Sequence, residues 1–209
     1  STGPQGLVQT GTVTFTEGDE VAPINKDSIT LLDENGQPAA SVEAKSPAGD
    51  VIGTFTVDKE TGVVTFTPTD KSYSGDVVPV KVQGKDTNGT VAETTYTPKI
   101  TPVVPTADPA TSTDIQGKTQ EGTPTFTQGD ETAPITINEQ QPAKFVVNGQ
   151  PVEDKEIPAT KDGKEVGKYV IDPLTGVVTF KPNKDFVGTP DPATVEVKDK
   201  NGTPATATY

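Results

Sequence analysis

The chain has 209 residues, of which 30% are apolar and 5% aromatic, with 20 glycines and 20 prolines. Its net charge is −13, from 30 acidic and 17 basic residues, and every basic residue is a lysine. This composition excludes membrane spans and argues against helix-rich folds. The absence of arginine and of a basic stripe argues against a nucleic-acid partner.

Four residue types that carry much of protein chemistry are missing, because the chain has no cysteine, methionine, histidine or tryptophan. Their absence removes thiol nucleophiles, disulfides, imidazole bases and the usual zinc and haem ligands. A chain without cysteine or methionine also has little to lose to oxidants, which fits an extracellular setting. The start, STGPQGLVQTG, shows no signal peptide, so we expect a segment of a longer, processed chain.

Strands are predicted where apolar and polar residues alternate between turn signals. The first predicted strand runs from Thr12 to Thr16, with Val13 and Phe15 on one face, and the second runs from Ser28 to Leu32. Thr and Val are abundant, and both are β-branched residues that pack well on a pleated sheet.

A β-hairpin is predicted where Phe55 and Val57 lead through the turn DKETG into Val64 and Phe66. The glycine of that turn supplies the positive φ of a bulged loop. The same pattern returns in the second half of the chain at four residues, Tyr169, Ile171, Val178 and Phe180.

A second hairpin is predicted around an Asn-Gly turn. Val78, Val80 and Val82 alternate with polar neighbours, the chain turns at residues 86–89 (DTNG), and it returns towards Tyr96. Many short strands spaced by such turns predict an all-β fold made of Ig-like β-sandwiches with about seven strands each. Low hydrophobicity and high charge are also typical of disorder, but matched alternation across Asn-Gly turns favours a folded chain.

The two halves of the chain repeat one module. STGPQGLVQTGTVTFTEGDEVAPI matches STDIQGKTQEGTPTFTQGDETAPI, GTFTVDKETGVVTFTP matches GKYVIDPLTGVVTFKP, and KDTNGTVAETTY matches KDKNGTPATATY. The order is the same in both copies, with a short insertion in a loop of the second. We therefore predict two tandem domains, residues 1–97 and 112–209. Residues 98–111, with prolines at 98, 102, 105 and 109, are predicted to be an extended Pro-rich connector.

These blocks resemble the repeats of CshA-type fibrillar adhesins, the long cell-wall-anchored surface proteins of oral streptococci and their relatives. The resemblance covers essentially the whole chain and rests on the strings GTxTFTxGDExxPI, IDPLTGVVTFKP and DxNGTxAxxxY. It implies repeated modules of a peripheral fibril, with the principal host-binding activity in a separate N-terminal region. It also implies an extracellular location at the cell surface, with cell-wall anchoring through a region outside these residues.

Acidic residues beside turns are the candidate calcium ligands, since calcium prefers several oxygen atoms. They occur at four places: Asp86 with Asn88, Asp199 with Asn201, Asp33 to Asn35, and Asp19 with Glu20. A calcium loop normally gathers six or more oxygens, whereas each of these places offers two or three. Asp and Asn are also preferred turn residues, so we expect turns and no metal site.

No pattern in the sequence marks an active site. Serine and threonine have no histidine partner, no glycine-rich phosphate loop precedes a helix, and nothing singles out a carboxylate pair, although 30 acidic residues leave a chance pair open. We expect no enzymatic activity, no catalytic residue and no cofactor. Lys–Asn or Lys–Asp isopeptide bonds, found in some Gram-positive surface domains, are a further alternative. Most lysines and asparagines here lie in turn strings such as KDTNG, which favours solvated side chains.

Six aromatic residues have two interpretations, a ligand-stacking surface or the core of each module. Their alternating strand positions favour the core. They are Phe15, Phe66 and Tyr96 in the first half and Phe126, Phe180 and Tyr209 in the second.

Repetition and the missing chemistry together favour a structural stalk or spacer that holds an adhesive region away from the cell wall. Its expected partners are neighbouring repeats of the same fibril, with no nucleic acid and no membrane, and the chain is expected to be a monomer. The alternative is a direct adhesion module that binds a host matrix protein or another microbe's surface, in which case repetition would raise avidity.

Overall fold

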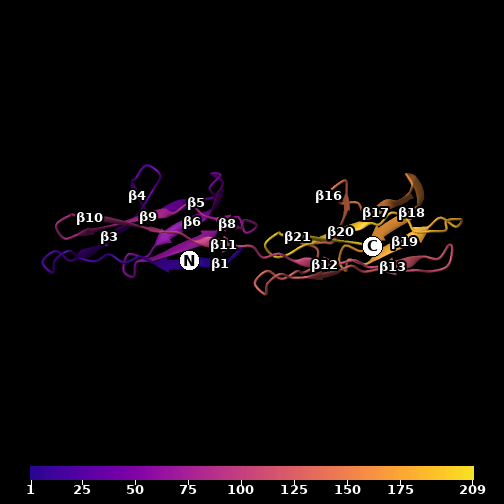
Figure 1. Ribbon diagram of the computed structural model, residues 1–209, viewed down its shortest axis with the longest axis horizontal. Coiled ribbons are helices and arrows are strands. Elements are labelled where there is room, and N and C mark those ends of the chain that lie inside the picture. The colour runs from indigo at the N-terminus through magenta and orange to yellow at the C-terminus, as the bar shows by residue number, and fades with distance from the viewer. The chain divides into compact units, whose positions relative to one another are not determined.

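The computed structural model describes all 209 residues, and it contains strands and turns but no helix. The chain divides into two compact units, Ser1–Pro102 and Val103–Tyr209, drawn from indigo to magenta and from magenta to yellow in Figure 1. Each unit is a β-sandwich, which confirms the predicted all-β fold with two tandem domains. No segment forms a helix long and apolar enough to cross a membrane.

The first unit contains two four-stranded sheets and one three-stranded sheet. One large sheet has the order β2 (Gln9–Thr12), β7 (Val63–Pro68), β6 (Val51–Val57) and β5 (Ser41–Lys45). The other has the order β10 (Val91–Tyr96), β9 (Val80–Asp86), β3 (Ile24–Leu32) and β4 (Pro38–Ala39). The small sheet has β11 (Lys99–Thr101) between β1 (Thr2–Pro4) and β8 (Gly75–Asp76), and β1 runs parallel to β11.

The second unit repeats the two large sheets. One has the order β13 (Gln120–Gly122), β19 (Val178–Pro182), β18 (Lys164–Ile171) and β17 (Glu156–Lys161). The other has the order β16 (Gln150–Pro151), β15 (Lys144–Val147), β20 (Thr194–Lys198) and β21 (Pro204–Thr208). Its small sheet is different, because it pairs β12 (Thr106–Asp108) with β14 (Thr125–Thr127).

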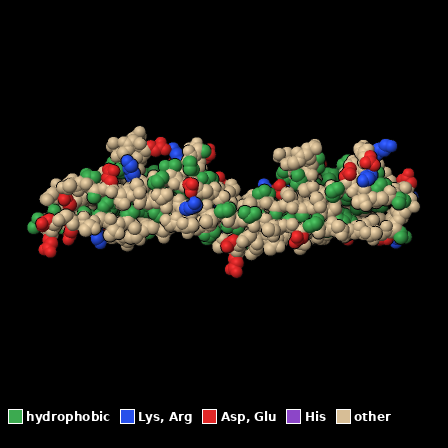
Figure 2. All heavy atoms as spheres, in the orientation of Figure 1, with side chains coloured by type: hydrophobic (Ala, Val, Ile, Leu, Met, Phe, Trp, Pro, Cys, Tyr) green, Lys and Arg blue, Asp and Glu red, His purple; other side chains and the backbone are tan.

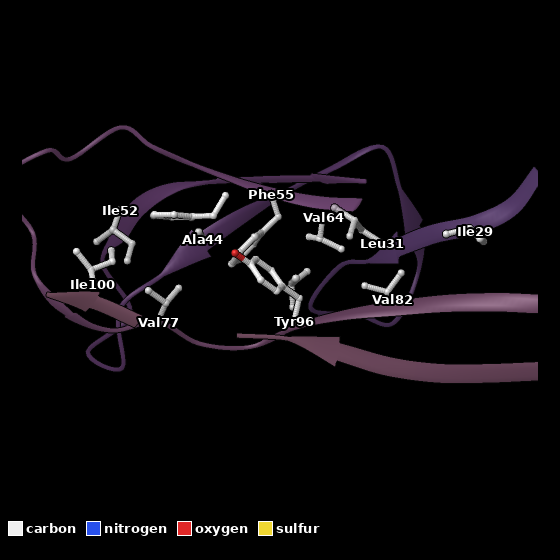
Figure 3. Close-up of a cluster of buried hydrophobic side chains, with 12 residues drawn as sticks. Ile29, Leu31, Ala44, Ile52, Phe55, Val64, Val77, Val82, Tyr96 and Ile100 are labelled. Carbon is white, nitrogen blue, oxygen red and sulfur yellow. The ribbon is translucent and has the colours of Figure 1, made fainter. Parts of the chain in front are cut away.

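The core of the first unit lies between its two large sheets (Figure 3). Phe55 packs against Phe66 with ring centroids 5.6 Å apart, and it meets the ring of Tyr96 edge-on at 6.1 Å. Ile52, Val77 and Ile100 continue this cluster on one side of Phe55 in Figure 3. Tilted and edge-on aromatic pairs stabilise a fold beyond the burial of their surface area. These three rings are therefore important for the stability of the unit.

The second unit has a core of its own around Phe145, Tyr169 and Phe180, with the last two rings 5.3 Å apart. The core interpretation of the predicted aromatics is confirmed for Phe66, Tyr96 and Phe180, which are buried. The other three are half-buried against the cores, namely Phe15, Phe126 and Tyr209.

Both predicted hairpin types are confirmed. Phe55 faces Phe66 across β6 and β7, and Tyr169 faces Phe180 across β18 and β19. The β9–β10 hairpin turns at the predicted Asn-Gly, where Gly89 has a φ of 86°. The prediction is wrong for Val78, which lies before β9 and is exposed.

The first predicted strand is displaced. The structure has a strand at Gln9–Thr12, and residues 13–17 are not in a strand. The backbone N–H of Val13 donates instead to the carbonyl oxygen of Gly62, at 2.9 Å, which ends the pairing of β2 with β7. The alternation of Val13 and Phe15 correctly predicted which side chains face the core. It did not predict strand pairing, because pairing needs a neighbouring segment with free hydrogen-bonding groups.

The connector predicted over residues 98–111 differs from the structure in that two short stretches of it lie in paired strands. Lys99–Thr101 is the central strand of the first unit's small sheet, and Thr106–Asp108 is a strand of the second unit. The prolines at 98, 102, 105 and 109 flank these strands and occupy neither. Proline excludes itself from central pairing, but the residues between prolines keep their N–H groups and can pair.

Candidate functional site

A groove with apolar and polar lining residues lies in the second unit and has a volume of about 470 Å³. It is lined by the segment before β13, by Tyr169 of β18 and Phe180 of β19, by the end of β21, and by the loop that follows Val187. Tyr169 and Phe180 form its apolar floor together with Tyr209.

Polar groups in this groove are held by hydrogen bonds within the unit. Ser112 Oγ donates to Gln120 Oε1 at 2.6 Å and lies 2.7 Å from the hydroxyl of Tyr209. The hydroxyl of Tyr169 donates to the carbonyl oxygen of Asp191 at 2.8 Å. Burial raises the pKa of Tyr169 to about 12, so its phenol stays neutral at physiological pH and is not a general base.

The same place in the first unit is closed. Ser1 Oγ donates to Gln9 Oε1 at 2.9 Å and lies 2.7 Å from the hydroxyl of Tyr96, which repeats the arrangement of the second unit. Here, however, Gln9 Nε2 also donates to the carbonyl oxygen of Lys99, at 3.2 Å, and Ile100 is only 3% exposed. Strand β11 therefore covers in the first unit what is an open groove in the second.

In each of the four acidic turns, an aspartate carboxylate oxygen accepts backbone N–H groups of its own turn. Asp33 Oδ1 accepts hydrogen bonds from the backbone N–H groups of Asn35 and Gln37. Asp19 Oδ1 accepts from Val21, and Asp86 Oδ1 accepts from Thr90. The hairpin aspartates behave alike: Thr61 and then Glu60 donate backbone N–H groups to Asp58, which lowers the pKa of that carboxyl. These oxygens stabilise turns, as expected for Asp at such positions.

Asp199 differs from the other three in its burial, because it is completely buried while its counterpart Asp86 is half-buried. Its Oδ1 accepts from the backbone N–H groups of Asn201 and Thr203, each at 2.9 Å, but its buried Oδ2 has no hydrogen-bond partner. Gln141 lies over it, with Nε2 donating to the Asp199 carbonyl oxygen at 3.1 Å. No group of three or more acidic side chains gathers here or elsewhere in the chain.

Comparison with family models matches residues 1–100 and 102–209, each to the surface adhesin CshA repetitive domain. The chain belongs to this family. It is a tandem of two CshA repeats, and the family consists of adhesin repeats rather than enzymes, at an extracellular surface location. The resemblance inferred from the sequence strings is thus confirmed.

Solved structures similar to the two CshA repeats include a tetra-tandem repeat from the extending region of a large adhesion protein. That match has 14% identity and a TM-score of 0.27, and it covers 98% of this chain and 44% of that one. Murine CEACAM1b matches at 13% identity and a TM-score of 0.27, over 86% of this chain and 96% of that one. The serine-rich repeat adhesion glycoprotein Srr1 of Streptococcus agalactiae matches at 11% identity and a TM-score of 0.20, over 99% of this chain and 84% of that one. No curated protein matches the chain.

None of the lysines of the CshA repeats lies in an apolar core. Lys45 and Lys144 are the least exposed, and each pairs with a glutamate, Glu34 and Glu153 respectively. Isopeptide bonds form in apolar surroundings, where a neutral lysine amine can attack an amide or acid. The positions of these lysines therefore favour the solvated interpretation.

Calcium binding by the CshA repeats can be tested by melting. We expect the thermal unfolding midpoint to be the same, within error, in EDTA and in millimolar calcium, because the acidic turns use their oxygens on backbone N–H groups. A bound ion would raise the midpoint by mass action. Saturable stabilisation by calcium, lost in Asp199→Asn but kept in Asp86→Asn, would place a metal at the buried Oδ2 and contradict the prediction.

Proposed function

We propose that the chain is a stalk or spacer of a bacterial cell-surface fibrillar adhesin, which projects an N-terminal adhesive region from the cell wall. What supports this is the succession along the chain of two sandwiches, each with its own core. Strand β11 of the first unit ends at Thr101 and β12 of the second unit begins at Thr106, so only four residues separate the two strands.

The surface also supports a passive role. On the face drawn in Figure 2, charged side chains lie among apolar and other polar groups over both units. The net charge of −13 favours solubility and repulsion between parallel chains. We propose that the partners are neighbouring repeats of the same fibril, that the chain itself is a monomer without enzymatic activity, and that the fibril is anchored to the cell wall.

Small-angle scattering of the 209-residue chain tests the spacer. We expect a maximum dimension clearly beyond that of a compact globule of this length, whose radius of gyration would be about 17 Å. The expectation rests on the prolines at 98, 102, 105 and 109, which favour an extended backbone. A compact profile with a radius of gyration near that of a single globule would contradict the proposal.

Direct adhesion is the alternative function, and one observation favours it. Ile115 and Val187 are 70% and 75% exposed in the unit that carries the groove. A binding module should capture host matrix proteins from an immobilised panel, and Ile115→Ser with Val187→Ser should abolish capture. A spacer should capture none of them.

A further inference from the structure

The open groove of the second unit corresponds to a place that a strand fills in the first. In the first unit, β11 lies between β1 and β8. Alignment of the modules places residues 113–115 at the position of β1 and Gly188–Thr189 at the position of β8, and neither forms a strand. The backbone is nonetheless similar, since φ is 134° at Gly75 and 124° at its counterpart Gly188.

The flanking segments lack the backbone ladder of the first unit, and both backbone groups of Ile115 are bonded locally, its N–H to Asp114 Oδ1 at 2.7 Å and its carbonyl oxygen to the Lys118 N–H at 3.1 Å. In the first unit, the N–H of Lys99 donates to the carbonyl oxygen of Ser1, and the N–H of Gln5 donates to the carbonyl oxygen of Thr101, both at 2.9 Å. Gln9 Nε2 donates to the same strand, whereas Nε2 of its counterpart Gln120 has no protein partner. An added strand would supply such a ladder in the second unit as β11 does in the first.

The glutamines beside this place are also more exposed in the second unit than in the first. Gln5 and Gln9 are 3% and 6% exposed beside β11, while their counterparts Gln116 and Gln120 are exposed and half-buried. Ile115 follows the groove residue Asp114, and Val187 precedes the groove residue Gly188, so two of the most exposed aliphatic side chains of the chain lie at its edges. Exposed apolar surface beside segments without a backbone ladder is typical of a site for strand addition.

We propose that the groove of the second unit is the acceptor for an extended, proline-flanked strand of the type Thr97–Val103 (TPKITPV), placed after Tyr209 as that segment is placed after Tyr96. Its isoleucine fills the space over Tyr169 and Phe180, and its backbone pairs with residues 113–115 and 188–189. The connecting segment of such a tandem array is then a structural part of the unit before it. This holds whether the chain acts as a spacer or as an adhesion module.

The test is to extend the full chain after Tyr209 by the sequence of residues 97–103. We expect the unfolding midpoint of the second unit to rise by about 5 °C or more, because added packing and pairing stabilise a unit of this size measurably. Amides of Gln116 and Thr189 should gain protection from hydrogen exchange. The first unit, whose own groove is already filled, should not change.

A matched extension in which the isoleucine is replaced by aspartate is the control, and it should leave the second unit as it is in the unextended chain. Equal effects of the two extensions, or no effect of either, would overturn the proposal. So would self-association of the unextended chain through Tyr209 and Ile115 that the extension does not suppress, because the groove would then belong to a second copy.

A separate observation gives the first unit a similar groove at another place. Thr125–Thr127 forms β14 because β12 pairs with it, whereas the counterpart Thr14–Thr16 has no strand partner and borders a groove of about 480 Å³. We infer that Thr14–Thr16 accepts a strand of the type Thr106–Asp108, placed before Ser1.

Adding the sequence of residues 103–111 before Ser1 should raise the unfolding midpoint of the first unit and protect the amide of Phe15, without changing the second unit. A matched extension with proline at the three positions equivalent to Thr106–Asp108 cannot donate backbone N–H groups and should have no effect. Stabilisation that is the same for both extensions would overturn this second inference.

Discussion

Phe66→Ala is expected to destabilise the first unit by about 3 to 5 kcal/mol and to leave the second unit unchanged. The Phe66 side chain is fully buried, and its ring packs against Phe55 at 5.6 Å. Gly53 on the paired strand leaves room for that ring, since a Cβ there would lie 2.6 Å from it. A domain of about 100 residues has roughly 5 to 15 kcal/mol of net stability, so this change removes a large part of it.

Chemical denaturation followed by hydrogen exchange would assign the loss to one unit. Phe15→Ala is a suitable control, because Phe15 is only half-buried against the same cluster. We expect this substitution to reduce the free energy of unfolding clearly less than Phe66→Ala does. Phe180→Ala should have the reverse effect, destabilising only the second unit. If either buried-ring variant destabilised both units equally, the two repeats would share one cooperative core, and the serial spacer would lose its basis.

The sequence was sufficient for the parts of the fold that depend on local signals. The β6–β7 and β9–β10 hairpins need only alternation and a turn with a glycine at positive φ, and both are encoded within about 15 residues. The same signals recur at Tyr169 and Phe180, and this repetition predicts the second sandwich.

Pairing between distant segments could not be predicted in this way. Lys99–Thr101 carries no alternation that distinguishes a strand from a connector, and it pairs with Thr2–Pro4, nearly a hundred residues away. Its proline neighbours indicated an extended backbone, which was correct, but an extended backbone is compatible with both a free linker and a strand. Such a segment becomes a strand only where a neighbouring strand has backbone groups left to pair with it.

Burial of the acidic turns also depended on distant residues. KDTNG and KDKNG are nearly identical locally, yet Asp199 is buried and Asp86 is not. The difference comes from the loop that holds Gln141, in the region where the second module has its insertion. A local turn signal carries no information about what packs over the turn, so nothing in the sequence separates Asp199 from the other candidates.

Ile100→Asp is the second variant with a large expected effect. Ile100 is 3% exposed and packs in the first unit's core near Ile52 and Val77, as Figure 3 shows. Aspartate at this position would lose the apolar contacts and would place an unpaired carboxylate among aliphatic side chains. We expect the first unit to lose about 3 kcal/mol or more, measured by chemical denaturation at neutral pH.

Val104→Asp is the matched control, because it introduces the same charge in the same proline-rich segment at a side chain that is 62% exposed. It should change stability by no more than about 0.5 kcal/mol. A free connector would tolerate both substitutions equally. Equal tolerance would therefore mean that Lys99–Thr101 does not stabilise the first unit, and the groove of the second unit would lose the template from which its missing strand is inferred.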